Sequence, residues 1–212
     1  MAIMDAAAPV SILKTKVYMP PPHGNLVLRP RLLQRLAHAL AHPLTLICAP
    51  AGFGKTTLIA DFRRHCGQPG GFVDLAGLPN GIADARFAWL SLEERDNDPA
   101  PFVTYLIAAL QQIQPLVGQT VLQLLQTPNP PAPMSLLPAL LNELAALPPD
   151  ALVVLILDDY HVIGDSRVHD LIAFFVEHLP AQVRLVLTSR SDPPLPLSRW
   201  RVRGQLCEVR AA

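Results

Sequence analysis

Hydrophobic residues along this chain follow two spacings, one typical of helices and the other typical of buried strands. Leucines recur at helical spacing through 32–40, and the Arg29-Pro30 pair before them predicts the start of a helix. Shorter, mostly apolar runs predict strands that are buried on both faces. These runs lie at 44–49, 87–92, 152–159 and 183–190, and a weaker one lies at 205–210.

Helical patterns separate the apolar runs. Helices are expected at 55–66, 98–113, 117–126, 135–147 and 166–179, with Asp98 and Ser135 as caps. Residues 67–86 are polar and contain Gly and Pro, so we expect them to form a surface excursion. Strands that alternate with helices predict a parallel sheet with right-handed crossovers and helices on both faces. The expected fold class is therefore α/β, in three α/β/α layers.

The start of the chain differs from the rest because it is rich in proline and irregular. We expect residues 1–28 to form an N-terminal arm and residues 29–212 to form one domain. The chain has 212 residues, half of them hydrophobic, which is enough to bury one substantial core.

The composition excludes several classes of partner. Lys and Arg total 17, as do Asp and Glu, so the bulk charge does not recruit nucleic acid or an anionic membrane. No apolar run approaches the roughly 18 to 20 residues that a membrane span needs. The three cysteines are scattered without zinc-type spacing, which fits a reducing compartment. We expect a cytoplasmic protein without a membrane partner.

One short segment carries the clearest chemistry. Ala49–Thr57 matches the phosphate-loop pattern GxxxxGK[ST], except that Ala49 stands where the first glycine is usual. Such a loop points backbone N–H groups at phosphate oxygens, and the positive end of the following helix faces the same place. Lys55 is expected to reach the β- and γ-phosphates, and Thr56 to offer its hydroxyl to Mg²⁺. The chain should therefore be a P-loop NTPase that binds ATP or ADP with Mg²⁺ through Ala51, Gly52, Phe53, Gly54, Lys55, Thr56 and Thr57.

Two acidic residues and one arginine follow buried strands, where open α/β sheets bind ligands. Asp158 is expected to hold Mg²⁺, through water, at the end of an aliphatic run. Asp159 could position the attacking water or simply cap the turn. Arg190 could sense the γ-phosphate or be a solvated surface residue. His161 and His169 lack a matching set of metal ligands, so we interpret them as loop and helix-face residues.

Several stretches, in this order, carry a family resemblance: KTKVYMPPP, LVLRPRLLQRL, LTLICAPAGFGKTTL, AWLSLEERDNDPAPF, VLILDDYHVI and LVLTSRSDPPLPL. They resemble the N-terminal ATPase domain of the MalT-type large LuxR-family transcriptional regulators, which belong to the STAND class of signal-transduction ATPases. The resemblance implies that Lys55 and Thr56 contact phosphate and Mg²⁺, that Asp158 is the acidic strand-end residue, and that Arg190 senses the γ-phosphate. It also implies that the segment around Arg29 lies near the adenine.

The resemblance further implies a switch, in which ADP holds a resting form, ATP and an inducer favour an active oligomer, and slow hydrolysis resets the protein. Such regulators continue through a helical lid, a winged-helix region, a sensor and a DNA-binding domain. Inducer binding, self-association and DNA binding are therefore expected outside these 212 residues, and the chain is expected to be a fragment or a natural short form. A small-molecule phosphotransferase and a module that binds nucleotide without hydrolysis are the alternatives, because a fold does not fix a function.

Overall fold

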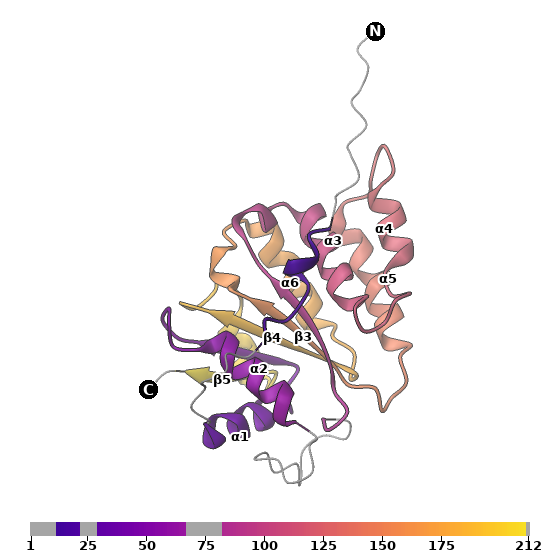
Figure 1. Ribbon diagram of the computed structural model, residues 1–212. Helices are drawn as coiled ribbons and strands as arrows, with labels where there is room; N and C mark the ends of the chain where they lie inside the picture. Colours follow the sequence, from indigo (N-terminus) through magenta and orange to yellow (C-terminus); the bar gives the residue numbers. More distant parts are fainter. Residues whose placement is uncertain (1–11, 22–28, 67–81, 211–212) are drawn as a thin grey trace.

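The computed structural model describes residues 12–21, 29–66 and 82–210. Within these ranges, five strands form one sheet in the order β2-β3-β4-β1-β5, and every neighbouring pair is parallel (Figure 1). The strands are β1 (Leu44–Cys48), β2 (Arg86–Ser91), β3 (Val153–Asp158), β4 (Val183–Ser189) and β5 (Leu206–Arg210). All five apolar runs in the sequence therefore form strands, and the predicted parallel sheet is confirmed.

Helices cover both faces of this sheet. Helices α1 and α2 pack on one face, while α3 to α7 pack on the other, which confirms the three-layer α/β/α prediction. The helices are α1 (Pro30–Ala39), α2 (Lys55–His65), α3 (Pro99–Leu110), α4 (Gln119–Leu125), α5 (Pro133–Ala145), α6 (Ser166–Glu177) and α7 (Leu197–Val202), and the 3-10 turns are η1 (Lys14–Lys16), η2 (Glu94–Asn97) and η3 (Tyr160–Val162). In the described part of the chain, no helix has the length and apolar character needed to cross a bilayer.

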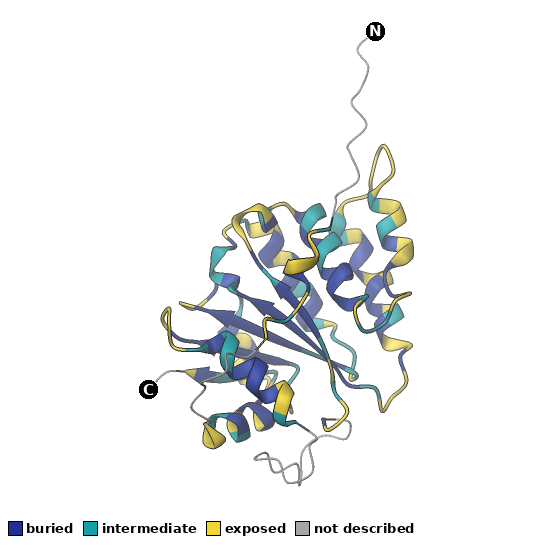
Figure 2. Ribbon diagram, in the orientation of Figure 1, coloured by how far each residue is buried: buried dark blue, intermediate teal, exposed yellow. Residues whose placement is uncertain are grey.

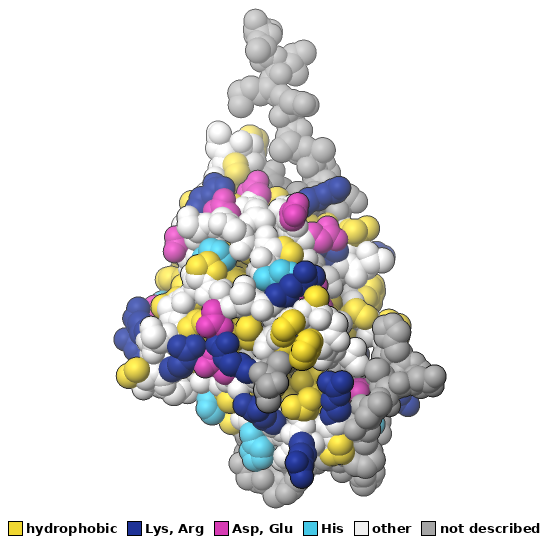
Figure 3. Space-filling view, turned by 90° about the vertical axis from the view of Figure 1, so that its left-hand side faces the viewer, with side chains coloured by type: hydrophobic (Ala, Val, Ile, Leu, Met, Phe, Trp, Pro, Cys, Tyr) yellow, Lys and Arg dark blue, Asp and Glu magenta, His cyan; other side chains and the backbone are white. Residues whose placement is uncertain are grey.

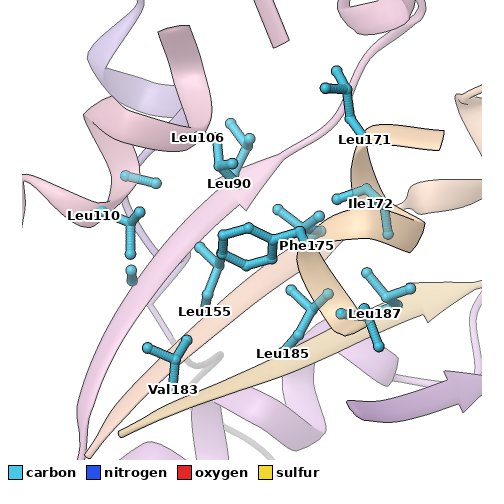
Figure 4. Packing of buried hydrophobic residues seen from close by; sticks show 14 of the residues in the cluster. Leu90, Leu106, Leu110, Leu155, Leu171, Ile172, Phe175, Val183, Leu185 and Leu187 are labelled. Atoms are coloured by element: carbon cyan, nitrogen blue, oxygen red, sulfur yellow. The ribbon is translucent and has the colours of Figure 1, made fainter. Parts of the chain in front are cut away.

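The strands are buried along their length because side chains from both of their faces enter a core. In β3, Leu155 and Leu157 face the α3–α7 layer, whereas Val154 and Ile156 face α1 and α2. Figure 2 shows the consequence, since the strands are dark blue while the outer sides of the helices are yellow. Figure 4 shows Phe175 of α6 lying against Leu155 and Leu185 in the larger core.

Two local expectations need correction. Helix α5 begins at Pro133 with Ala132 as its N-cap, so Ser135 does not cap it, and the Ser135 hydroxyl instead donates to the Ala132 carbonyl at 2.7 Å. Proline suits a first helical turn because it needs no N–H partner there, which explains the earlier start. Helix α7 was not expected, because its six residues follow a proline-rich stretch and are too few to show a period. Most of the expected surface excursion, residues 67–81, lies outside the described residues.

Residues 12–21 of the expected arm pack against the domain. The Lys16 ammonium is buried and lies 2.7 Å from both carboxylate oxygens of Asp96, and it also lies 4.1 Å from the centre of the Tyr105 ring. Val17 beside it enters the larger core. This part of the arm is therefore built into the domain, while residues 1–11 and 22–28 lie outside the described residues.

Candidate nucleotide-binding site

The phosphate loop lies between β1 and α2, at the carboxyl edge of the sheet, on the left-hand side of Figure 1. Gly52 and Gly54 have φ angles of 80° and 76°, in the left-handed region that favours glycine, so the sequence forms this curl without strain. The Lys55 ammonium is buried inside the loop, where it donates to the carbonyl oxygens of Ala49 at 2.8 Å and Pro50 at 3.2 Å. The loop thus holds one positive charge next to a helix N-terminus, an arrangement that suits an anion.

A pocket of about 290 Å³ opens beside the loop. Its walls come from α1, β1, the phosphate loop, α2 and β5, and its lining is apolar except for a few charged groups. Those groups are Lys55 and the guanidinium groups of Arg29, Arg35 and Arg210. Arg29 also donates to the Phe53 carbonyl oxygen at 3.5 Å, which places the start of α1 against the phosphate loop. Figure 3 shows the same side of the molecule, where Lys and Arg side chains lie around hydrophobic ones.

The structure brings Asp158 and Thr56 together. Asp158 ends β3 and is 5% exposed, and its carboxylate accepts hydrogen bonds from Thr56 Oγ1 at 2.9 Å and Thr188 Oγ1 at 2.6 Å. Burial raises the pKa of Asp158, and the two hydroxyl bonds oppose that rise because they favour the ionised form. Hydroxyl and carboxylate oxygens are ligands that Mg²⁺ prefers, so the donor set fits the ion that the sequence predicts.

Asp159 adopts an uncommon backbone conformation. Its φ angle is 60°, the single positive value among the described non-glycine residues, and its N–H donates to Thr188 Oγ1 at 2.9 Å. Asp159 is the N-cap residue of η3, and its carbonyl oxygen accepts from the Val162 N–H at 3.1 Å, but its side chain makes no capping hydrogen bond. Its carboxylate is 45% exposed and lies 3.7 Å from Nδ1 of His161. Aspartate tolerates this conformation better than most residues, and uncommon backbone conformations of this kind cluster at functional sites.

Arg190 and His161 lie at the same edge. Arg190 is exposed directly after β4. The pKa of His161 is lowered overall, mainly because the ring is buried. The charge of Asp159 opposes this shift, while the charges of Arg190 and Lys55 add to it. The ring is therefore mostly neutral at pH 7. Its protonation is influenced by charged groups that follow three strands, Lys55 after β1, Asp159 after β3 and Arg190 after β4. His161 lies in the 3-10 turn η3 of the connection after β3, where the sequence interpretation places a loop residue.

Sequence reasoning also missed Thr188, which is fully buried and whose hydroxyl donates to the Asp158 carboxylate and accepts from the Asp159 backbone N–H. A polar residue near the end of an otherwise apolar run was the available signal, but threonine is also common in strands. The roles of Asp158, Asp159 and Arg190 stay predictions.

Comparison with known proteins agrees with this geometry. The family model described as "AAA ATPase domain" matches residues 25–188. The chain belongs to this family. It is 34% identical over 197 residues to the HTH-type transcriptional regulator MalT of Vibrio cholerae, and 37% identical over 200 residues to MalT of Serratia proteamaculans. Each alignment covers 93% of this chain and 20% of the relative, so the chain spans about one fifth of the length of these regulators.

The resemblance to the N-terminal part of MalT-type regulators is thus confirmed for this AAA ATPase domain. Among solved structures, a Walker-type ATPase of Pyrococcus abyssi superposes with a TM-score of 0.49 and 15% identity, over 82% of this chain and 48% of that one. That likeness is too distant to add to the fold seen directly here.

Proposed function

We propose that this AAA ATPase domain is the ATP-binding switch of a longer MalT-type transcriptional regulator, and that it hydrolyses ATP slowly. One observation supports this most strongly. The carboxylate of Asp158, from β3, accepts a hydrogen bond from Thr56 directly after Lys55 of the phosphate loop, beside a pocket large enough for part of a nucleotide. A cation, a metal-ligand pair and an apolar pocket are the three parts that a Mg·nucleotide requires.

In this proposal the phosphates bind the loop from Ala51 to Thr57, and Lys55 exchanges its carbonyl partners for phosphate oxygens. Thr56 and Asp158 hold Mg²⁺, which supplies charge neutralisation when it is bound. The base enters the pocket that Arg29 helps to line.

The groups after β3 and β4 serve the terminal phosphate. Asp159, with its carboxylate directed toward solvent, orients the attacking water, and Arg190 contacts the γ-phosphate that ATP has and ADP lacks. The ring of His161, with Nδ1 3.7 Å from the Asp159 carboxylate, limits how that carboxylate can move.

A switch needs such a γ-phosphate contact, because a ligand shifts an equilibrium only by its different affinities for the two forms. ADP would then stabilise the resting form, and ATP with an inducer the active one. Inducer recognition, self-association and DNA binding are proposed for the remainder of the longer protein, in the cytoplasm.

The test compares Lys55→Ala with Lys14→Ala, which removes an exposed lysine from η1. Titration calorimetry with Mg·ATP and with ADP should show roughly a tenfold to hundredfold loss for Lys55→Ala, since a charge-assisted hydrogen bond contributes about 1.5 to 3 kcal/mol. Lys14→Ala should bind as the unmodified protein does. Equal affinities for all three proteins would refute the phosphate-site assignment.

A companion assay distinguishes the rival functions. Incubation with ATP should release inorganic phosphate slowly. Phosphorylation of an added small-molecule acceptor faster than phosphate release would indicate a phosphotransferase, and nucleotide retained unchanged would indicate a binding module.

A further inference from the structure

The side-chain amide of Asn97 connects two loops at the carboxyl edge of the sheet. Asn97 ends η2, which follows β2. Its Nδ2 donates to the carbonyl oxygens of Glu94 at 2.9 Å and Val162 at 3.1 Å, and its Oδ1 accepts from the N–H groups of Gly164 at 2.7 Å and Asp165 at 2.9 Å. An amide side chain has two donor hydrogens and two acceptor lone pairs, so every capacity of this group is used.

Three of these four bonds go to the loop that joins β3 to α6. That loop carries Asp159 and His161 near its start, and Asn97 contacts it from Val162 onward. The hydroxyl of Thr188 fixes the other end of the same loop through the Asp159 N–H. The left-handed turn at Asp159 is therefore held at both ends, by one side chain from β4 and one from η2.

We propose that Asn97 is a positioning residue for ATP hydrolysis, which holds the loop so that Asp159 and His161 face the terminal phosphate. This inference rests on the proposed function. Asn97 does not line the nucleotide pocket. It follows β2, and strands β3 and β4 separate β2 from β1 and the phosphate loop. Its loss should therefore change the rate of hydrolysis and leave nucleotide affinity unchanged.

A purely structural link between loops is the competing explanation, and Gln182 provides the matched control. The Gln182 amide, between α6 and β4, also donates to two carbonyl oxygens at the end of α5 and just after it, those of Ala145 at 3.3 Å and Leu147 at 3.2 Å. It lies at the amino edge of the sheet, before β4 begins, whereas Asn97 lies at the carboxyl edge. Gln182→Ala therefore removes the same kind of link without touching the loop of Asp159.

The experiment measures kcat and KM for Mg·ATP, the Kd for ADP, and the midpoint of urea unfolding for the whole chain. Asn97→Asp keeps the acceptor that Gly164 and Asp165 use but replaces both donors by an oxygen that repels the Glu94 and Val162 carbonyls, whereas Asn97→Ala removes all four bonds. Misplacement by about 1 Å costs on the order of a hundredfold in rate. We expect kcat to fall by roughly that factor in both Asn97 variants, with KM and the ADP Kd within about twofold of the unmodified values.

The outcomes separate this inference from the proposed function. If the unmodified protein releases no phosphate, the proposed hydrolysis is wrong and the role of Asn97 falls with it. If the unmodified protein hydrolyses ATP and Asn97→Asp does so equally fast, only the positioning role is refuted. The positioning role would also be refuted if Asn97→Asp and Gln182→Ala lost kcat to the same extent for the same loss of stability.

Discussion

Replacing Thr188 by valine tests the hydrogen-bonded group at the ends of β3 and β4. Valine has nearly the shape of threonine, and Thr188 is fully buried, so the change removes a hydroxyl without opening a cavity. The hydroxyl donates to the Asp158 carboxylate at 2.6 Å and accepts from the Asp159 N–H at 2.9 Å. Losing the charged bond costs about 1.5 to 3 kcal/mol and losing the neutral one costs about 1 kcal/mol, so the free energy of unfolding should fall by about 3 kcal/mol.

The effect should depend on pH because one partner is a carboxylate. Burial raises the folded-state pKa of Asp158, and the Thr188 hydroxyl opposes that rise by favouring the ionised form. Because the pKa of Asp158 is higher still without the hydroxyl, the extra stabilisation is complete above the pKa of Asp158 in the variant, and its charge-dependent part is lost as the pH falls through that value and the lower one of the unmodified protein. Below both pKa values the hydroxyl still donates to the neutral carboxyl group, so Thr188→Val should differ from the unmodified protein by about 2 kcal/mol, about 1 kcal/mol for each neutral bond.

Urea unfolding in EDTA, at neutral and at acidic pH, measures both effects. The control is Thr45→Val in β1, because the Thr45 hydroxyl is fully buried and has no hydrogen-bond partner among the described residues. That variant should be neutral or more stable, since it removes an unsatisfied polar group. A Thr188→Val protein as stable as Thr45→Val at neutral pH would refute the role assigned to the Thr188 hydroxyl.

Three further changes test other parts of the molecule. Asp158→Asn should weaken Mg·ATP binding while leaving ADP binding in EDTA nearly intact, and equal losses in calorimetry would mean that Asp158 is structural. Arg190→Ala should keep ADP affinity but lower ATP affinity by roughly tenfold to a hundredfold, and an unchanged ratio in competition with a fluorescent ADP analogue would remove Arg190 from the site. Lys16→Met should lower the free energy of unfolding by about 3 to 5 kcal/mol, because it leaves the Asp96 carboxylate buried without its cation, and a loss below about 1 kcal/mol in urea would contradict this.

The parts of the fold that the sequence predicts are those that local patterns determine. Apolar runs indicated each strand, β5 more weakly than the others, and glycine spacing indicated the left-handed turns at Gly52 and Gly54. The proximity of Thr56 to Asp158 was also predictable, because the carboxyl ends of parallel strands meet at one edge of a sheet. No knowledge of strand order was needed for any of these.

The parts that escaped prediction depend on contacts between distant residues. Lys16 reads as an exposed charge in a proline-rich arm, and nothing near it in the chain reveals that Asp96 is its partner. Asn97 reads as a neighbour of a helix cap, although its bonds to the β3–α6 loop connect positions more than sixty residues apart. Hydrophobic periodicity shows which residues are buried, but it does not show which polar groups they meet there.

The strand order has a consequence for how the chain acquires its fold. Strand β1 carries the phosphate loop at its end, yet Leu44 pairs with Leu185 of β4 and Leu206 of β5, near the end of the described chain. Contacts between residues so far apart form late, because the intervening chain must first lose its freedom. During synthesis, β1 and α2 leave the ribosome long before either neighbouring strand exists. On the proposed function, nucleotide would therefore bind only after almost the whole domain has been made, and it would stabilise completed molecules rather than guide early folding.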